Sequence, residues 1–263
     1  MSTVSASASN QDKPNHEPNQ DRYAAFNPTI ASITLRALLG RRRAFILAAP
    51  AVVLLLITII LKSAHGTSTT WPAEVLGRVG FSAMLPLTAL IVGTSVLGAE
   101  IDDSSILHLL ATPVPRNAII LTKAVIAAAV TLVFAAIPEF AAGIIATGHV
   151  GKFALGLLLG AALGSVVYTA VFVLISTVTR HPVAFALAYV AVWEGLVTNL
   201  ASGAKYLSAE QYSLGVVNSI AKDDALNAHL TATTAVILGV IVTVAALGYA
   251  GNRLRSFALT GDA

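Results

Sequence analysis

A short segment at residues 100–116 gathers acidic residues at its start and a basic residue at its end. The acidic cluster consists of Glu100, Asp102 and Asp103, and Arg116 closes the segment. Carboxylates near the amino end of a helix and a cation near its carboxyl end both interact favourably with the helix dipole. The charge order therefore predicts a short helix that runs toward Pro113.

The same segment carries an apolar face. Ile106, Leu109 and Leu110 fall on one side of the predicted helix, which can lie against a membrane or a protein partner while its acidic turn stays in water. An ordinary capped loop helix has the same charge order. The pattern predicts the helix and leaves its role open between a docking element and a simple connection.

Two further carboxylates lie inside apolar stretches, where an ionisable side chain costs about 2.5–3.5 kcal/mol at the centre of a membrane helix. Glu194 lies about midway along one such stretch, so we expect it to face a polar cavity or a polar partner such as Asn199. Its role stays open between substrate binding and the locking of helices. Glu139 follows Pro138 near the end of another stretch, and we expect it to be solvated there.

The sequence carries no recognised catalytic or metal-binding pattern. The chain has no cysteine, and its histidines are scattered without the i, i+4 spacing of a helical zinc site. Gly151-Lys152 comes nearest to a phosphate-binding loop, but Ala146 stands where the first glycine belongs and Phe153 follows the lysine. We therefore expect no catalytic residue, no metal and no cofactor in this chain.

Composition places these residues in a membrane protein. The 263-residue chain is 56% hydrophobic and 11% charged, and its apolar residues form long runs separated by short polar stretches. One soluble core does not need so much apolar surface, so lipid is the expected solvent. The formal net charge of +3 comes largely from basic residues beside apolar runs. Such residues report membrane orientation, so we expect no nucleic-acid partner.

The sequence predicts an all-α, polytopic membrane protein with six transmembrane helices. Each apolar run is close to or longer than the roughly twenty residues that cross a bilayer. The predicted spans are 44–62, 79–99, 118–138, 153–178, 183–202 and 232–250. Prolines at positions 50, 86 and 138 predict kinks, because each removes a backbone donor.

The remaining segments are assigned from composition and capping signals. Residues 1–25 are polar and predict a disordered tail, and residues 256–263 form a second tail. Between them lies one transmembrane domain, residues 26–255, which starts with an amphipathic interfacial helix at 27–43. The longest external loop, 203–231, contains Ser208 and Gln211 at capping-box spacing, which predicts a short helix over the bundle.

Charge distribution around the spans predicts that both termini are cytoplasmic. Basic residues near the span ends divide nine against five, with Arg36, Arg41, Arg42, Arg43, Arg116, Lys123, Arg180, Arg253 and Arg255 on the richer side. The positive-inside rule assigns that side to the cytoplasm.

A stripe of small residues marks the fourth span. Gly156, Gly160 and Gly164 recur every four residues, which lets another helix backbone come close. Packing within the subunit is the default interpretation, and a seam between two subunits is the alternative.

The 100–116 segment resembles the first cytoplasmic loop of type-2 ABC exporter permeases, the ABC-2 type. The family pattern is an acidic cluster, a Gly-Thr step, a Leu-rich turn, then Pro-Val/Ile-x-Arg and a lysine at the next span. The matching positions are Glu100, Asp102, Asp103, Leu109, Leu110, Pro113, Val114, Arg116 and Lys123. Ser104-Ser105 replace the Gly-Thr step, and Ile101 stands where a polar residue is common.

The resemblance extends over about residues 26–255, because the interfacial helix, six spans and long last loop are similar. A second local match joins Trp193-Glu194-Gly195 to Leu207-Ser208 and Gln211-Tyr212. It is similar to an actinobacterial-looking subset of these permeases.

The resemblance implies a function. The 100–117 loop would be a coupling helix that docks into a separate cytoplasmic ATPase subunit, which binds ATP and Mg²⁺. Two permease subunits, as a homodimer or heterodimer, would form an exporter in the bacterial plasma membrane. The sequence does not identify the exported substrate. A non-transporting scaffold or sensor and an ion-coupled transporter are the alternatives.

Overall fold

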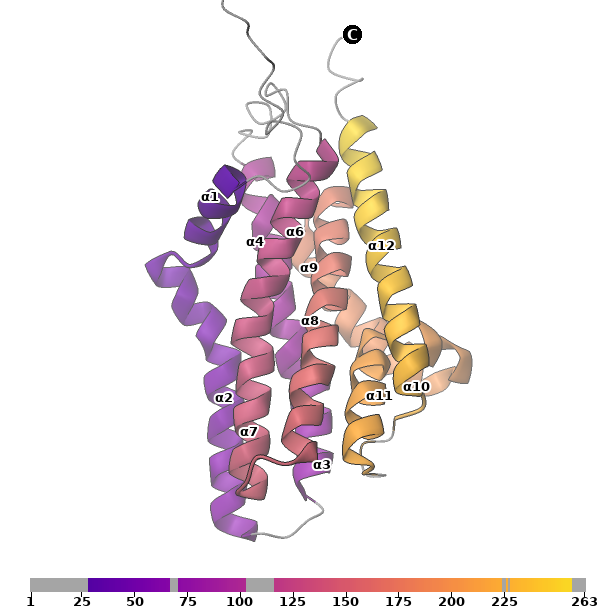
Figure 1. Cartoon of the computed structure of the whole chain (residues 1–263). Coiled ribbons are helices and arrows are strands. Elements are labelled where there is room, and N and C mark those ends of the chain that lie inside the picture. The colour runs from indigo at the N-terminus through magenta and orange to yellow at the C-terminus, as the bar shows by residue number, and fades with distance from the viewer. Residues whose placement is uncertain (1–27, 67–70, 103–115, 224–225, 227, 257–263) are drawn as a thin grey trace, which may run out of the picture.

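The computed structural model describes residues 28–66, 71–102, 116–223, 226 and 228–256, and every regular element in these ranges is a helix (Figure 1). Most are α-helices, three are π-helical stretches and one is a 3-10 helix. In chain order they are α1 (Pro28–Leu38), α2 (Arg41–His65), α3 (Trp71–Val75), η2 (π, Leu76–Met84), α4 (Leu85–Asp102), α6 (Arg116–Thr131), η3 (π, Leu132–Ala136), α7 (Ile137–Thr147), α8 (Lys152–Val178), α9 (Pro182–Ala188), η4 (π, Tyr189–Val197), α10 (Thr198–Leu200), η5 (3-10, Ser202–Leu207), α11 (Ala209–Ala221) and α12 (Ala232–Ser256).

Six continuous helical stretches in the described ranges are long and apolar enough to cross a membrane, which confirms the predicted all-α polytopic fold. They are Arg43–His65, Trp71–Val96, Ile119–Thr147, Lys152–Val178, Pro182–Leu200 and Ala232–Arg253. The second span starts earlier than predicted, at Trp71, and the third ends later, at Thr147. Both differences arise because polar residues such as Arg78 and Glu139 continue the helix instead of ending it.

The outward faces of these spans are apolar. Large side chains such as Ile60, Val244 and Phe185 are more than half exposed in the isolated chain. An outer surface of this kind is suited to lipid, which solvates hydrocarbon and offers backbone groups no hydrogen bonds. Buried polar side chains such as Glu139 and Glu194 lie on the inner faces.

The interfacial helix is shorter than predicted. The sequence suggested residues 27–43, whereas α1 ends at Leu38 and Arg41–Arg43 form the first turn of α2. Gly40 separates the two helices with extended backbone angles, φ −51° and ψ 139°. The Arg43 guanidinium donates to the Ala37 carbonyl at 3.4 Å, which stabilises the carboxyl end of α1.

At two of the three prolines where kinks were predicted, the preceding helical turn is a wide π turn. Before Pro86, the Leu85 amide donates to the Gly80 carbonyl, and before Pro138, the Ile137 amide donates to the Leu132 carbonyl. Both bonds span five residues instead of four. The wider turn keeps the helix continuous where proline lacks its own donor.

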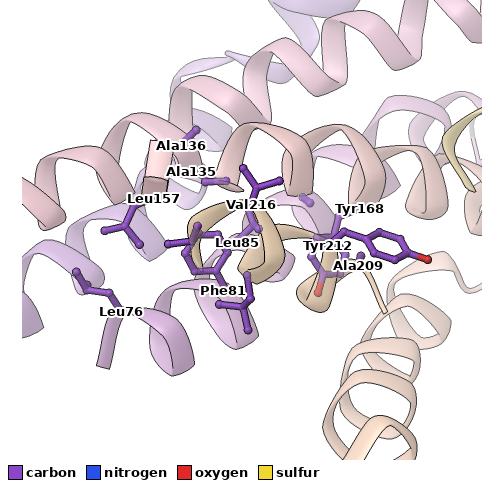
Figure 2. Packing of buried hydrophobic residues seen from close by; sticks show 14 of the residues in the cluster. Leu76, Phe81, Leu85, Ala135, Ala136, Leu157, Tyr168, Ala209, Tyr212 and Val216 are labelled. Atoms are coloured by element: carbon purple, nitrogen blue, oxygen red, sulfur yellow. The ribbon is translucent and has the colours of Figure 1, made fainter. Parts of the chain in front are cut away.

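Two apolar clusters hold the bundle together. We call the end that contains α1 and the end of α12 the terminal end, and the opposite end the far end (Figure 1). The terminal cluster consists of Leu38, Leu47, Val92, Val96, Ile120, Ala127, Val130, Val173 and Ala250. The larger cluster joins the second span, α8 and α11, and Figure 2 shows Leu76, Phe81 and Leu85 gathered with Tyr212 and Val216.

The predicted short helix of the long loop is α11, but it does not lie over the bundle. It packs lengthwise along α8, antiparallel to it, in the half of the bundle toward the far end (Figure 1). Ser213 lies against Gly160 and Gly164, and Val217 lies against Gly156 and Gly160. Because Gly164 is near the middle of α8, the amino end of α11 lies deep within the bundle.

The glycine stripe is therefore used inside the chain. All three glycines are buried beneath α11. The alternative that they form a seam between two subunits is wrong for this structure, because α11 of the same chain already fills the groove. A small-residue stripe shows that a backbone approaches closely, and it does not reveal which backbone.

We predict that Gly160→Ala destabilises the protein. A Cβ at this position would lie 2.5 Å from Val217 Cγ2 and 2.6 Å from the Ser213 carbonyl oxygen, so α11 would have to move. Overpacking of this kind costs about 1–3 kcal/mol. The melting temperature of the full chain in nanodiscs measures the effect. Gly248→Ala in α12, where a Cβ meets nothing within 4 Å, is the matched control. Equal melting temperatures for the two variants would contradict the packing argument.

Candidate functional site

Glu194 lies in the π-helical stretch of the fifth span and is only 3% exposed. Its Oε1 atom accepts hydrogen bonds from the Tyr189 hydroxyl at 3.1 Å and from the Ala209 amide at 2.9 Å. The Ser208 hydroxyl donates to its Oε2 atom. The carboxylate therefore joins the fifth span to the first residues of α11.

The Glu194 carboxylate supplies a hydrogen-bond acceptor that the amino end of α11 needs. The first amides of any helix lack partners within the helix, and here they lie deep in the bundle. Ser208 caps the helix, because its hydroxyl oxygen accepts from the Gln211 amide at 3.1 Å, as the sequence spacing predicted. Glu194 accepts the Ala209 amide, so the side chain acts as a second cap supplied by a distant helix.

Neighbouring bonds fix the same junction. The Trp193 indole donates to the Leu207 carbonyl at 3.1 Å, and the Tyr212 hydroxyl donates to the Tyr206 carbonyl at 2.6 Å. Thr198 donates its hydroxyl to the Glu194 carbonyl at 2.5 Å. The stretches around Trp193 and Leu207, which together formed the second local match to the permease family, are thus in contact.

Asn199 is not the partner of Glu194. Its side chain is exposed, and its amide donates to the Gly195 carbonyl of its own helix at 2.7 Å. Both residues line the same pocket without touching through a hydrogen bond. Direct pairing was the wrong expectation, because the Glu194 carboxylate accepts from Tyr189, Ser208 and Ala209 instead.

Glu210, which sequence reasoning did not select, is the second carboxylate at this junction. The Ser82 hydroxyl of the second span donates to its Oε1 atom at 2.5 Å. Burial raises the pKa of Glu210 to about 7; the Ser82 hydrogen bond opposes this shift and the charge of Glu194 adds to it. Its position just after the Ser208 cap was the only signal in the sequence.

A pocket of about 620 Å³ opens between the second span, the fifth span and α11. Its lining combines polar, charged and small apolar residues. They are Ala73, Glu74, Gly77, Arg78, Ser82, Val190, Glu194, Gly195, Thr198, Asn199, Lys205, Glu210, Gln211, Leu214, Leu226 and His229. The volume is within the range of small-molecule sites in proteins.

Glu139 is not solvated, contrary to expectation. It is 1% exposed, and neither carboxylate oxygen has a hydrogen-bond partner in the described part of the chain. A Cβ on Gly80 would overlap this carboxyl group, so the absence of a side chain there makes its space. The third span continues to Thr147, which places Glu139 inside the bundle instead of at its edge.

The predicted coupling residues are only partly described. Glu100 and Asp102 lie in the last turn of α4, and Arg116 is the first residue of α6. The expectation that the acids start a helix and Arg116 ends one, in favour of the helix dipole, is therefore wrong, because the preceding helix continues to Asp102. Asp103, Leu109, Leu110 and Pro113 lie outside the described residues, as do the tails at 1–25 and 257–263. Lys123, the last position of the family pattern, is buried and donates to the Val96 carbonyl at 3.3 Å.

No three His, Asp or Glu residues in the described ranges come together in a group that could hold a metal ion. The arrangement at α11 is instead one of hydrogen-bond donors, two carboxylates and an open pocket. The donors and the Glu194 carboxylate cap α11, and the pocket beside them is large enough for a small molecule.

Six apolar spans, a short helix before the first span and a helix folded back along the fourth define an all-α polytopic membrane protein. The chain belongs to the ABC-2 transporter family, since the family described as ABC-2 family transporter protein matches residues 2–257. It is thus a membrane permease component of an ABC transporter, a class that works with an ABC ATPase. No curated protein matches the chain.

We predict that Glu194→Ala destabilises the protein by about 2 kcal/mol or more, because buried donors at Tyr189, Ser208 and Ala209 lose their acceptor. Glu194→Gln keeps a carbonyl oxygen and should have a smaller effect. Chemical or thermal unfolding in nanodiscs measures both. Asn199→Ala, which removes an exposed bond within one helix, is the control. If Glu194→Ala unfolds like this control, the carboxylate does not hold α11.

We predict that Glu210→Gln stabilises the protein increasingly as the pH rises from about 4.5 to 7, and fully above that range. With a folded pKa of about 7 against an ordinary 4.5, the folded state resists losing this proton, so stability falls as pH rises between these values. The variant should melt like wild type at about pH 4 and higher than wild type at about pH 8.5. Glu74→Gln, at an exposed position of the same pocket, is the control. A pH-independent difference for Glu210→Gln would contradict this assignment.

Proposed function

We propose that the chain is the membrane-spanning subunit of an ATP-driven exporter, in which a separate ATPase docks on the loop 100–117. The ATPase would bind ATP and Mg²⁺, and a second permease subunit would complete the transporter. The loop and both termini would face the cytoplasm from the plasma membrane, in agreement with the positive-inside rule. The proposal rests on the way in which the helices at the two ends of this loop are anchored in the bundle.

Both ends of the loop enter the terminal cluster. Val96 of α4 and Ile120 of α6, which lie on either side of the loop, are buried in this cluster. The ammonium group of Lys123 crosses between the same two helices to the Val96 carbonyl. A displacement of the loop would therefore move α4 and α6 together.

The terminal cluster also connects α4 and α6 to other helices, so it could transmit a displacement of the loop to them. Leu38 of α1, Val173 of α8 and Ala250 of α12 pack in it. At the α4–α8 contact, the Ser176 hydroxyl donates to the Gly93 carbonyl at 3.3 Å. Packed interiors transmit small displacements because they deform little. This arrangement supports a role for the loop in coupling an ATPase to the spans.

We predict that replacing Glu100 and Asp102 together by Ala weakens ATPase binding without reducing the amount of permease in the membrane. The acidic turn lies at the end of a span, so its loss removes charge from the docking surface and leaves the terminal cluster intact. The wild-type and variant chains would be purified from native membranes in mild detergent. The bound ATPase would be identified by mass spectrometry, and its ATP hydrolysis would be measured.

Replacing Asp12 and Glu17 by Ala is the control, because it removes two carboxylates from the amino-terminal tail on the same predicted side. We expect a loss of bound ATPase of about tenfold for the Glu100 and Asp102 variant, comparable to one charge-assisted contact, and no loss for the control. Unchanged ATPase binding and hydrolysis would mean that these acids are only a solvated helix end. The absence of any ATPase from the wild-type sample would favour a scaffold or sensor.

A further inference from the structure

We propose that the pocket beside α11 binds a small organic zwitterion, with its ammonium group against Glu194 and Glu210 and its acidic group toward Lys205 and His229. The proposal concerns ligand binding by this chain and does not depend on the proposed coupling to an ATPase. It rests on the pocket, on the positions of its charges and on the Glu210 oxygen to which no described residue donates.

The inner part of the pocket is acidic. Glu194 and Glu210 come from different elements, both line the cavity, and neither forms an ion pair with a described residue. Ser82 occupies one oxygen of Glu210, and no described residue donates to the other oxygen. A buried carboxylate without a cationic partner is costly, so an incoming ammonium group would gain a charge-assisted hydrogen bond there.

The outer part of the pocket is predominantly basic. Lys205 of η5 is half-buried, and its Nζ atom lies 2.8 Å from Nε2 of His229, which is exposed. Arg78 of the second span is exposed on another wall, one turn after the exposed Glu74. These bases favour an anionic group on the more exposed side of the pocket. A simple cation would leave this half of the site unused.

The rest of the lining suits a short connecting chain. Val190, Leu214 and Leu226 provide apolar walls, and Gly77 and Gly195 carry no side chain into the cavity. The volume of about 620 Å³ leaves space for a small molecule with two charged ends. A free solute and the headgroup of a zwitterionic lipid share this chemistry.

The test measures binding of three probes to the full chain in nanodiscs of phosphatidylglycerol. Phosphoethanolamine is the zwitterion, ethanolamine is the cation and glycerol phosphate is the anion. We expect phosphoethanolamine to bind at least about tenfold more tightly than either single-charge probe, since it makes both charged contacts. Equal affinity for all three probes, or no binding of phosphoethanolamine at roughly 10 mM, would overturn the proposal.

Two variants test which pocket residues bind the ammonium group and the acidic group of the ligand. Glu210→Gln keeps an acceptor for Ser82 and should weaken phosphoethanolamine and ethanolamine by about tenfold or more, with no loss for glycerol phosphate. Lys205→Gln should weaken phosphoethanolamine and spare ethanolamine. Lys222→Gln, at an exposed residue outside the pocket, should change neither. Melting curves of each variant separate lost binding from lost folding, and unchanged affinity in a folded Glu210→Gln protein would overturn the proposal.

The lipid composition of the nanodisc distinguishes the two sources of the ligand. If the natural occupant is a lipid headgroup, phosphatidylethanolamine in the disc competes, and soluble phosphoethanolamine binds more weakly than in phosphatidylglycerol. If it is a free solute, the two discs give the same affinity. Failure of ATPase binding in the coupling experiment would leave these measurements unaffected.

Discussion

The structure depends on one constraint: the amino end of a helix lies deep in a membrane bundle, where its first residues are buried and its free amides need acceptors. Helix α11 starts beside the middle of α8, and its first amides need acceptors from the protein. Ser208 supplies one from within the loop, and Glu194 supplies another from the fifth span. The costly burial of a carboxyl group in a span is therefore offset by the donors that converge on it.

The same constraint accounts for the glycine stripe and for the pocket. A helix can run antiparallel along α8 only where side chains are absent, and Gly156, Gly160 and Gly164 provide that groove. Glu194 holds α11 at its amino end, and a pocket lies between α11 and the second and fifth spans. Glu210, one residue beyond the capped amide, faces that space with Ser82. Packing, capping and the pocket are thus consequences of one folded-back helix.

The two ends of the bundle have different construction. At the terminal end, apolar side chains from α1, α2, α4, α6, α8 and α12 form one cluster around the bases of the loop 100–117. Toward the far end, the packing includes tyrosines, carboxylates and a cavity. In the proposed transporter, the compact terminal end would receive displacement from the ATPase, and the more polar half would meet the ligand.

The sequence by itself determined the class of the protein. Long apolar runs require lipid, and their length and number predicted the six spans; the pattern from Glu100 to Lys123 pointed to the ABC-2 family that the chain belongs to. These properties are local or additive along the chain, so they can be read without knowing which elements touch. The Ser208 cap could be predicted for the same reason, because its partner lies three residues away.

Only the tertiary structure decided the partners of the polar residues. Asn199 was the nearest candidate for Glu194 in sequence, but the carboxylate instead contacts Ser208 and Ala209 across a chain reversal. Glu139 was expected in water and is buried, and α11 was expected over the bundle and lies within it. Each of these depends on which helix faces which, and hydrophobic length carries no such information. Small residues and buried charges indicate that something must lie close by, and the folded chain determines what that is.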